Sequence, residues 1–375
     1  MRGWNVSGNN DVALFANTSA AEVSGSNYGN PTATGFFAEG GFANSATYIY
    51  IAIRRGPMKV PTSGTSVFSA QTGTYSAGDS LSVGFSADMY IDAWRTGTLY
   101  KANYSRLVNF ANSNSSASQN YLKTNTTDAE VTTSQAPSLY DLWNTTAKVG
   151  SWNAGVSEVW WMFRRAPGFF DEVCYTGTDA VRTINHNLGV APELIIVKGR
   201  NTNPANSSYW TVYTQPTGNT NYMYLDSTNA TSAFSGYWNN TSPTASVFTL
   251  GTGNGEDTNA TGKNYVAYLF ATCAGVSKVF SYTGNGSSQT INCGFTGGAR
   301  FVLIKRTDST GDWYVWDSAR GIVSGNDPHL SLNTTAAEVT TDDTIDTDST
   351  GFVVNQVSAT NVNVSSATYI GFAVA

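Results

Sequence analysis

Short runs of hydrophobic residues, separated by turns rich in glycine and polar residues, form the main pattern of this chain. The pattern is clearest at the end of the chain, where β-branched and aromatic stretches alternate with turn dipeptides such as Gly297-Gly298 and Thr310-Gly311. No stretch keeps a helical period of about 3.6 residues over ten residues, so we expect an all-β fold. The predicted strands of this part are 279–282, 289–292, 301–305, 313–317, 329–332, 351–355 and 368–374.

Part of this pattern returns along the chain as a weak repeat. The segment 175–198, YTGTDAVRTINHNLGVAPELIIVK, matches 282–305, YTGNGSSQTINCGFTGGARFVLIK. The shift is 107 positions (282 minus 175), which is longer than the roughly 20–50 residues of a solenoid repeat. A repeat of this length can bury a core of its own. The sequence therefore predicts a tandem array of small β-sandwich, jelly-roll-like repeat domains.

The ends of the repeats set the predicted domain boundaries. Four aromatic and aliphatic stretches close successive copies: YIYIAI, VWWMF, YVAYLF and YIGFAV. We expect a C-terminal half-repeat at 1–54, a divergent β repeat domain at 55–165, and β repeat domains at 166–273 and 274–375. A half sandwich leaves its sheet edges and apolar face open. It therefore needs an upstream segment, or completion on another domain or chain by strand addition.

Acidic and histidine residues offer no sign of catalysis. Glu22, Glu130 and Glu338 recur singly, one per copy, whereas a glycosidase needs two carboxylates across one sugar site. We interpret them as loop hydrogen-bond anchors. His186 and His329 lie at non-equivalent positions, and no nucleophile motif accompanies either one. The sequence predicts no catalytic residue, and the protein is not expected to be an enzyme.

Composition excludes several classes of partner. Charged residues make up 12% of the chain and the net charge is −6, which gives no electrostatic reason to bind nucleic acid or an anionic membrane. No apolar run approaches about 20 residues, so no membrane insertion is expected. The acidic stretch around Asp342 and Asp348 does not have EF-hand spacing, and we read it as a solvated loop. No metal and no cofactor are expected.

The three cysteines and the aromatic residues complete the set of candidates. Cys174, Cys273 and Cys293 lie at non-equivalent repeat positions, so we read them as small buried residues, with a Cys273–Cys293 bridge as the alternative. Recurring aromatics, in WTVY at 210–213 and WYVW at 313–316, are expected in the core. Aromatics in polar loops that do not recur are candidates for stacking on a sugar ring. These speculative ligand-binding residues are Trp143, Trp152, Tyr237 and Trp238.

Several long phrases resemble repeats of the large tail fibre proteins of marine tailed bacteriophages. They are FRRAPGFFDEVCYTG, INHNLGVAPELIIVKGRN, YLFATCAGVSKVFSYTGNGSSQTINCGF and IKRTDSTGDWYVWDSARGIVSGNDP. The resemblance is strongest over 160–375. It implies an extracellular virion component that is elongated and trimeric, contacts copies of itself and other virion proteins, and meets the host surface. The family offers no catalytic motif to carry over to this chain.

These expectations suggest a tail fibre or adhesin segment that recognises host-surface glycans by multivalent weak binding. The first alternative is an architectural virion component without receptor binding: a decoration, a fibre spacer or a self-assembling filament subunit. The second is a capsule depolymerase, which would need a carboxylate pair about 5–10 Å apart in a groove.

Overall fold

The computed structural model describes residues 59–75, 79–108, 119–133, 146–149, 155–201, 208–252 and 257–375, with a few short segments before residue 59. Those segments include the strands β1 (Asp11–Ala13), β2 (Val23–Ser26), β3 (Gly29–Pro31) and β4 (Phe36–Ala38). Most of the predicted half-repeat at 1–54 lies outside the described residues, so its role stays a prediction. The recurring Glu22 also lies outside them.

The predicted all-β class is confirmed. We call the segment from β5 to β12 the first unit, from β13 to β20 the second unit, and from β21 to β28 the third unit. The first unit contains η1 (Gly64–Ser66), β5 (Phe68–Tyr75), β6 (Asp79–Ser82), β7 (Met89–Trp94), β8 (Ala102–Ser105), β9 (Gln119–Lys123), β10 (Val131–Thr133), β11 (Thr146–Val149) and β12 (Val156–Phe163).

The second and third units follow the same plan. The second contains β13 (Phe170–Thr176), β14 (Arg182–Asn185), β15 (Leu194–Gly199), β16 (Thr211–Thr214), β17 (Asn221–Tyr224), β18 (Ser232–Ala233), α1 (Ser235–Trp238), β19 (Val247–Leu250) and β20 (Asn264–Phe270). The third contains β21 (Ser277–Thr283), β22 (Gln289–Asn292), β23 (Phe301–Arg306), β24 (Trp313–Asp317), β25 (His329–Ser331), β26 (Ile345–Asp348), β27 (Gly351–Val354) and β28 (Thr368–Val374).

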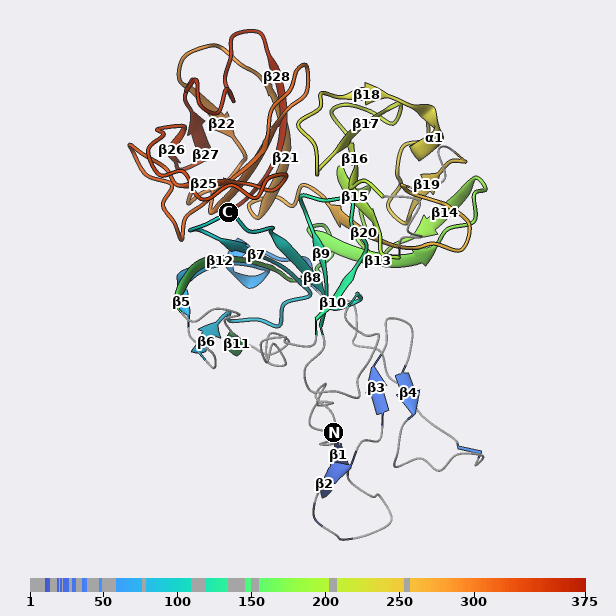
Figure 1. The fold of residues 1–375 in the computed structure, drawn as a ribbon. Coiled ribbons are helices and arrows are strands. Elements are labelled where there is room, and N and C mark those ends of the chain that lie inside the picture. Colours follow the sequence, from blue (N-terminus) through green and yellow to red (C-terminus); the bar gives the residue numbers. More distant parts are fainter. Residues whose placement is uncertain are drawn as a thin grey trace.

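Each unit has one large and one small antiparallel sheet (Figure 1). The large sheets have equivalent orders: β10-β9-β8-β7-β12-β5, β18-β17-β16-β15-β20-β13 and β25-β24-β23-β28-β21. In each of them the last strand of the unit inserts between the first strand and a central one. The small sheets are β11-β6, β14-β19 and β22-β27-β26. The strands of the three units fall within 55–165, 166–273 and 274–375, although the domain boundaries themselves stay a prediction.

The seven strands predicted in the third unit all form, and two details differ from expectation. Strand β26 (IDTD) was expected as an acidic loop, because only one of its four residues is apolar. The residues Gly284-Asn285-Gly286 are typical of a hairpin turn, but β21 pairs with β28 while β22 pairs with β27. The turn therefore carries the chain from the large sheet to the small one.

The large sheets are buried on both faces, which explains their continuous apolar strands. All six residues of β15 are buried, as are the last six of β20 and of β28. One face of each large sheet packs inside its own unit, in three separate cores. The other face joins a central core to which all three units contribute. The units are thus packed around a shared core and are not strung out as a line of independent domains.

Equivalent backbone contacts close the three units into a ring. The N–H of Glu130 in the first unit donates to Arg200 O in the second at 2.7 Å, and Thr231 in the second donates to Thr307 O in the third at 2.9 Å. Glu338 N–H in the third unit donates to Arg95 O in the first at 2.9 Å. We call these three contact regions the seams.

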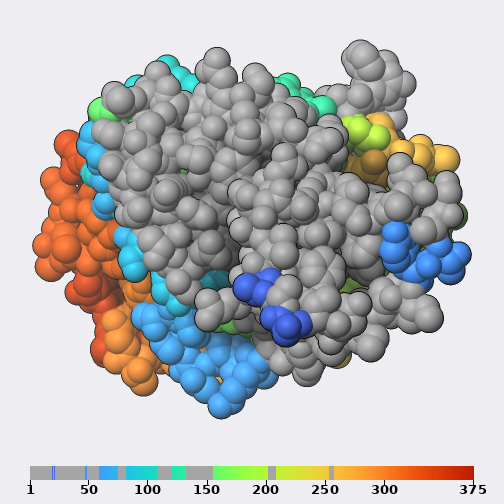
Figure 2. Space-filling model, turned by 90° about the horizontal axis from the view of Figure 1, so that it is seen from below, coloured from blue at the N-terminus to red at the C-terminus, as the bar shows by residue number. Residues whose placement is uncertain are grey.

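Ion pairs reinforce two of the seams. Glu130 pairs with Arg200 at 2.6 Å, and Glu338 pairs with Arg95 at 2.9 Å. The two recurring glutamates within the described residues are therefore hydrogen-bond anchors, as the sequence suggested, and the structure adds that they act between units. Seen from below in Figure 2, atoms of the first unit (blue) lie directly beside those of the third (orange). Arg300 Nη1 donates to Phe68 O across that seam at 3.3 Å.

Candidate functional site

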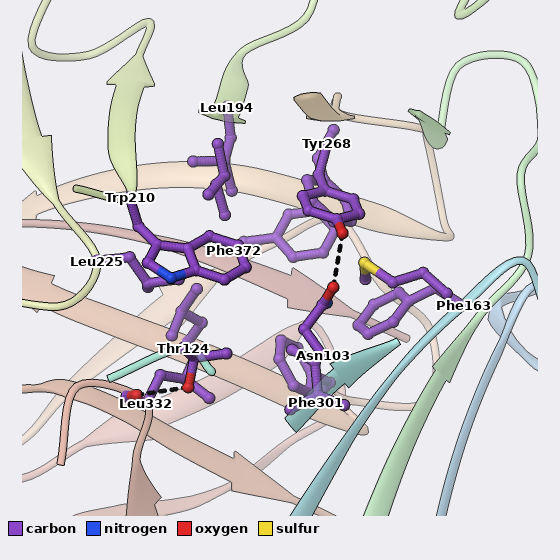
Figure 3. Close-up of a pocket in the computed structure, with 15 residues that line it drawn as sticks. Asn103, Thr124, Phe163, Leu194, Trp210, Leu225, Tyr268, Phe301, Leu332 and Phe372 are labelled. Atoms are coloured by element: carbon purple, nitrogen blue, oxygen red, sulfur yellow. Dashed lines mark hydrogen bonds between the residues drawn. The ribbon is translucent and has the colours of Figure 1, made fainter. Parts of the chain in front are cut away.

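A small cavity lies at the centre of the ring (Figure 3). Its volume is about 40 Å³ and its lining comes from all three units. Two hydrogen bonds satisfy polar groups of the lining: Tyr268 Oη donates to Asn103 Oδ1 at 2.6 Å, and Thr124 Oγ1 donates to Leu332 O at 2.7 Å. Ligand pockets measure about 300–1,000 Å³. The cavity is therefore a gap in core packing that a small-molecule ligand would not fit.

The predicted sugar-stacking residues do not gather into one site. Trp143 and Trp152 lie outside the described residues, so their role stays a prediction. Tyr237 and Trp238 lie in α1 and are only 1% and 2% exposed. They are not exposed as sugar stacking requires, because this single helical turn packs its two rings against the large sheet. Trp238 meets Tyr213 edge-on at 5.7 Å, and its Nε1 donates to Asn221 O at 3.1 Å.

The hydroxyl of Tyr237 nevertheless reaches a polar cluster near the surface. It donates to Asp257 Oδ2 at 2.5 Å and lies 2.8 Å from Tyr224 Oη. Burial is the main cause that raises the pKa of both tyrosines. Both hydroxyls therefore stay protonated at neutral pH, and the Asp257 carboxyl serves as an acceptor for this cluster.

An exposed aromatic surface lies beside that cluster. Tyr209 is 40% exposed and stacks on Tyr224, with ring centroids 4.3 Å apart and ring planes at 22°. Tyr222 follows at 5.0 Å from Tyr224. We call these three residues the Tyr209 platform. It presents an aromatic surface with hydroxyl groups at its edge, which is the arrangement expected for contact with a pyranose ring.

Two hydrogen bonds hold the backbone of the platform, one to Asp257 of the same unit and one from Trp313 of the third unit. Asp257 Oδ1 accepts a hydrogen bond from Tyr209 N–H at 3.0 Å. Trp313 Nε1 donates to Tyr224 O at 2.8 Å across the seam. The recurring Trp210 and Trp313 are fully buried, as predicted. These contacts fix the backbone on both sides of the stacked pair and thereby preorganise the platform.

Sequence reasoning missed Tyr209, although a signal was present. The match of WTVY to WYVW places Tyr209 opposite Asp312, so Tyr209 is an aromatic residue that does not recur in the third unit. The same criterion selected Tyr237 and Trp238. It could not separate exposed from buried rings, because α1 and its packing are not visible in the strand pattern.

The described part of the first unit contains a carboxyl pair of interest for acid–base chemistry. Asp92 and Glu158 lie on neighbouring strands of the first unit. Burial raises the pKa of Glu158 to about 7, and burial together with Glu158 raises the pKa of Asp92. Glu158 is only 2% exposed, so this pair does not line an open groove as a glycosidase requires.

Other polar candidates have structural contacts. His186 Nδ1 accepts a hydrogen bond from Leu188 N–H at 3.3 Å, and His329 lies between Tyr314 and Trp316. All three cysteines are free. Within the part of the chain that the structure describes, no three His, Cys, Asp or Glu side chains are grouped to hold a metal ion. No helix in that part is long and apolar enough to cross a membrane.

Comparison with known proteins gives a family without an activity. No curated protein matches the chain. The DUF7483 family, described as a domain of unknown function, matches residues 164–375. That range contains the second and third units, including the Tyr209 platform, and covers more than half of the sequence. The chain therefore belongs to the DUF7483 family.

Proposed function

We propose that this chain is a structural protein of a phage virion, a tail fibre or adhesin segment that binds glycans on the host surface. The observation that carries the proposal is the Tyr209 platform, in which the exposed ring of Tyr209 stacks on the half-buried ring of Tyr224 on a rigid sandwich. The resemblance of 160–375 to tail fibre repeats supports the same function.

The physical basis is weak stacking repeated many times. A sugar ring places its C–H groups on an aromatic face, while its hydroxyls bond to polar groups at the edge of that face. One such contact is weak, but several copies held on one particle raise the effective concentration. The proposed partners are copies of this chain in a trimer, other virion proteins and a host glycan. No enzymatic activity, nucleic-acid binding, membrane insertion or cofactor forms part of the proposal.

The alternative is a purely architectural role, and the closed ring favours it. The three units bury their central faces against one another, which suits a rigid spacer or decoration that touches only other virion proteins. Since the central core is complete within one chain, a trimer would have to form through other surfaces.

Binding to a glycan array and to intact bacterial envelopes tests the proposal. We expect saccharide-specific binding by the wild type, loss of about tenfold or more in Tyr209→Ala, and near-normal binding in Tyr209→Phe, which keeps the ring. Val323→Ala is the matched control, because Val323 is also exposed (46%) but lies in the third unit. Equal binding by wild type and a folded Tyr209→Ala would exclude the platform. No binding by any of these proteins would favour the architectural role.

A further inference from the structure

The hydrogen bonds of the large sheets reveal which residues are equivalent to the Tyr209 platform in the other units. The N–H groups of Thr124, Leu225 and Leu332 donate to the carbonyls of Lys101, Trp210 and Trp313, at 3.0, 2.9 and 2.9 Å. The residues one position before Lys101, Trp210 and Trp313 are therefore equivalent in the three units. They are Tyr100, Tyr209 and Asp312. By the same alignment, Lys123 of the first unit takes the place of Tyr224.

The first unit also has a stacked tyrosine pair at this position. Tyr100 is partly exposed and stacks on the buried Tyr121, with centroids 5.5 Å apart, planes at 11° and hydroxyl oxygens 2.8 Å apart. The third unit has Asp312 and His329 at the equivalent positions and lacks such a pair. Two of the three units thus carry an aromatic surface at the same place.

The two surfaces differ in charge. Lys123 Nζ lies 5.0 Å from the centroid of the Tyr100 ring and 3.0 Å from Asp128 Oδ2. Lys123 lowers the pKa of Asp128 through a hydrogen bond and its charge, and Lys198 lowers it further. Two ammonium groups therefore act on one carboxylate here. The Tyr209 platform instead has the Asp257 carboxyl directly behind it.

The lysine is positioned on a fixed backbone but can exchange its partner. Trp210 Nε1 of the second unit donates to Lys123 O at 2.9 Å and holds that strand end. The side chain of Asp128 is 52% exposed, and an ion pair this open is weak. The carboxylate of an acidic saccharide can therefore replace Asp128 as the partner of Lys123. The sugar ring of the same ligand then contacts Tyr100.

We propose that the first unit holds a second saccharide site, formed by Tyr100 and Lys123 and supported by the buried Tyr121, that selects an acidic saccharide. The sugar ring contacts Tyr100, and its carboxylate pairs with Lys123. This inference rests on the proposed glycan-binding function and deepens it, because it gives one chain two sites of unlike charge preference. The third unit, without the tyrosine pair, contributes none.

Titration calorimetry with two probes tests the inference. The probes are a hexasaccharide of galacturonic acid and the neutral hexasaccharide of galactose. We expect Lys123→Gln to weaken binding of the acidic probe about tenfold, and Asp128→Asn to strengthen it, because that change removes the competing carboxylate. Neither substitution should change binding of the neutral probe. Lys59→Gln, which alters an exposed lysine outside the proposed site, is the control.

The outcomes separate this inference from the proposed function. Unchanged acidic binding in a folded Lys123→Gln protein overturns the second site, even if Tyr209→Ala abolishes neutral binding and so supports the platform. Loss of acidic binding in Lys123→Gln without any effect of Tyr209→Ala supports the second site and rejects the platform. Inorganic phosphate is a third ligand. Competition by phosphate at the same concentration as the acidic hexasaccharide would show a simple anion site and overturn the saccharide assignment.

Discussion

Three lysines buried at the seams are the most unusual single residues of this protein. Lys101, Lys198 and Lys305 are each 0% exposed. Each Nζ donates to a backbone carbonyl of a neighbouring unit: to Thr334 at 2.9 Å, Thr126 at 3.2 Å and Thr228 at 2.8 Å. Burial lowers the pKa of each lysine to about 8. Carbonyl groups accept these hydrogen bonds but supply no countercharge.

The lysines predict that stability rises with pH in a narrow window. Their folded-state pKa of about 8 lies below the unfolded value of 10.5, so the unfolded chain binds more protons between these values. The free energy of unfolding should therefore increase as the pH rises, by about 1 kcal/mol per lysine between pH 8 and 9. Urea denaturation at several pH values measures this increase in the free energy of unfolding.

Lys198→Met provides the control for this pH effect. It removes one titrating group, so the rise from pH 8 to 9 should be smaller by about 1 kcal/mol than in the wild type. Parallel pH curves for the two proteins would show that Lys198 keeps an ordinary pKa.

A buried ion pair at the seam between the third and first units gives a second residue-level prediction. Arg320 and Asp317 have side chains 0% exposed and lie 2.6 Å apart, and Trp161 Nε1 of the first unit donates to Asp317 Oδ2 at 2.8 Å. Asp317→Asn should destabilise the protein by about 3 kcal/mol, the low end for a broken buried ion pair, because Glu338 remains as a partner of Arg320 at 3.2 Å. Trp161→Phe should cost less, about 1–3 kcal/mol. Guanidinium denaturation of the two variants would test this order of stability. Equal and small losses of unfolding free energy in both variants would contradict it.

The last strand of each unit, which is β28 in the third unit, pairs with the first strand of that unit. The residues that face each other at equivalent positions of these two strands differ in size between the units. Phe280 pairs with Gly371 in the third unit, Val173 with Ala267 in the second, and Gln71 with Trp160 in the first. A Cβ on Gly371 would lie 2.3 Å from both Phe280 Cζ and Leu303 O. A large residue on one strand is thus matched by a small residue on its neighbour.

This complementarity predicts a coupled pair of substitutions. Gly371→Ala should destabilise by about 1–3 kcal/mol through overpacking. The same change should cost less in a Phe280→Val background, which copies the pair of the second unit. A double-mutant cycle by urea denaturation measures the coupling. An equal cost of Gly371→Ala in both backgrounds would mean that only Leu303 O opposes the added methyl group.

Elements of the third unit could be predicted from sequence because their strands are β-branched or aromatic and bounded by glycine. Strand β26 could not, since IDTD has the composition of a loop and pairs only because β27 lies beside it. The short helix α1 contains one turn, too little for a helical period to show. The burial of Tyr237 and Trp238 depends on that turn, so the strand pattern could not predict it.

For the whole molecule, the shared central core predicts a single cooperative unfolding transition. Phe301 of the third unit contacts Phe68 and Phe163 of the first, with ring centroids 5.3 and 5.7 Å away. Tryptophan fluorescence and circular dichroism should therefore give coincident transitions in guanidinium. Phe301→Ala should shift the entire transition, by about 3–5 kcal/mol. Separate transitions for the units would contradict the ring and favour independent domains.

The closed arrangement could not be derived from the repeat. A period of about 107 residues predicts units of the right size, but nothing in it distinguishes a line from a ring. The distinction depends on residues that look like ordinary strand ends, such as Arg95 and Arg200, whose partners lie 243 and 70 positions away. The same holds for Tyr209, whose N–H donates to Asp257, 48 positions away.

The position of the closing strands has a consequence for the order of events on the ribosome. Strand β12 must enter between β5 and β7, and β28 between β21 and β23. A nascent unit therefore holds a sheet split in two until its last strand emerges, and its apolar faces stay open for that time. The seam between the third and first units can form only after most of the third unit has emerged. Premature release before β28 would leave both the last sheet and the central core exposed, so truncated chains should be the main aggregating species during synthesis.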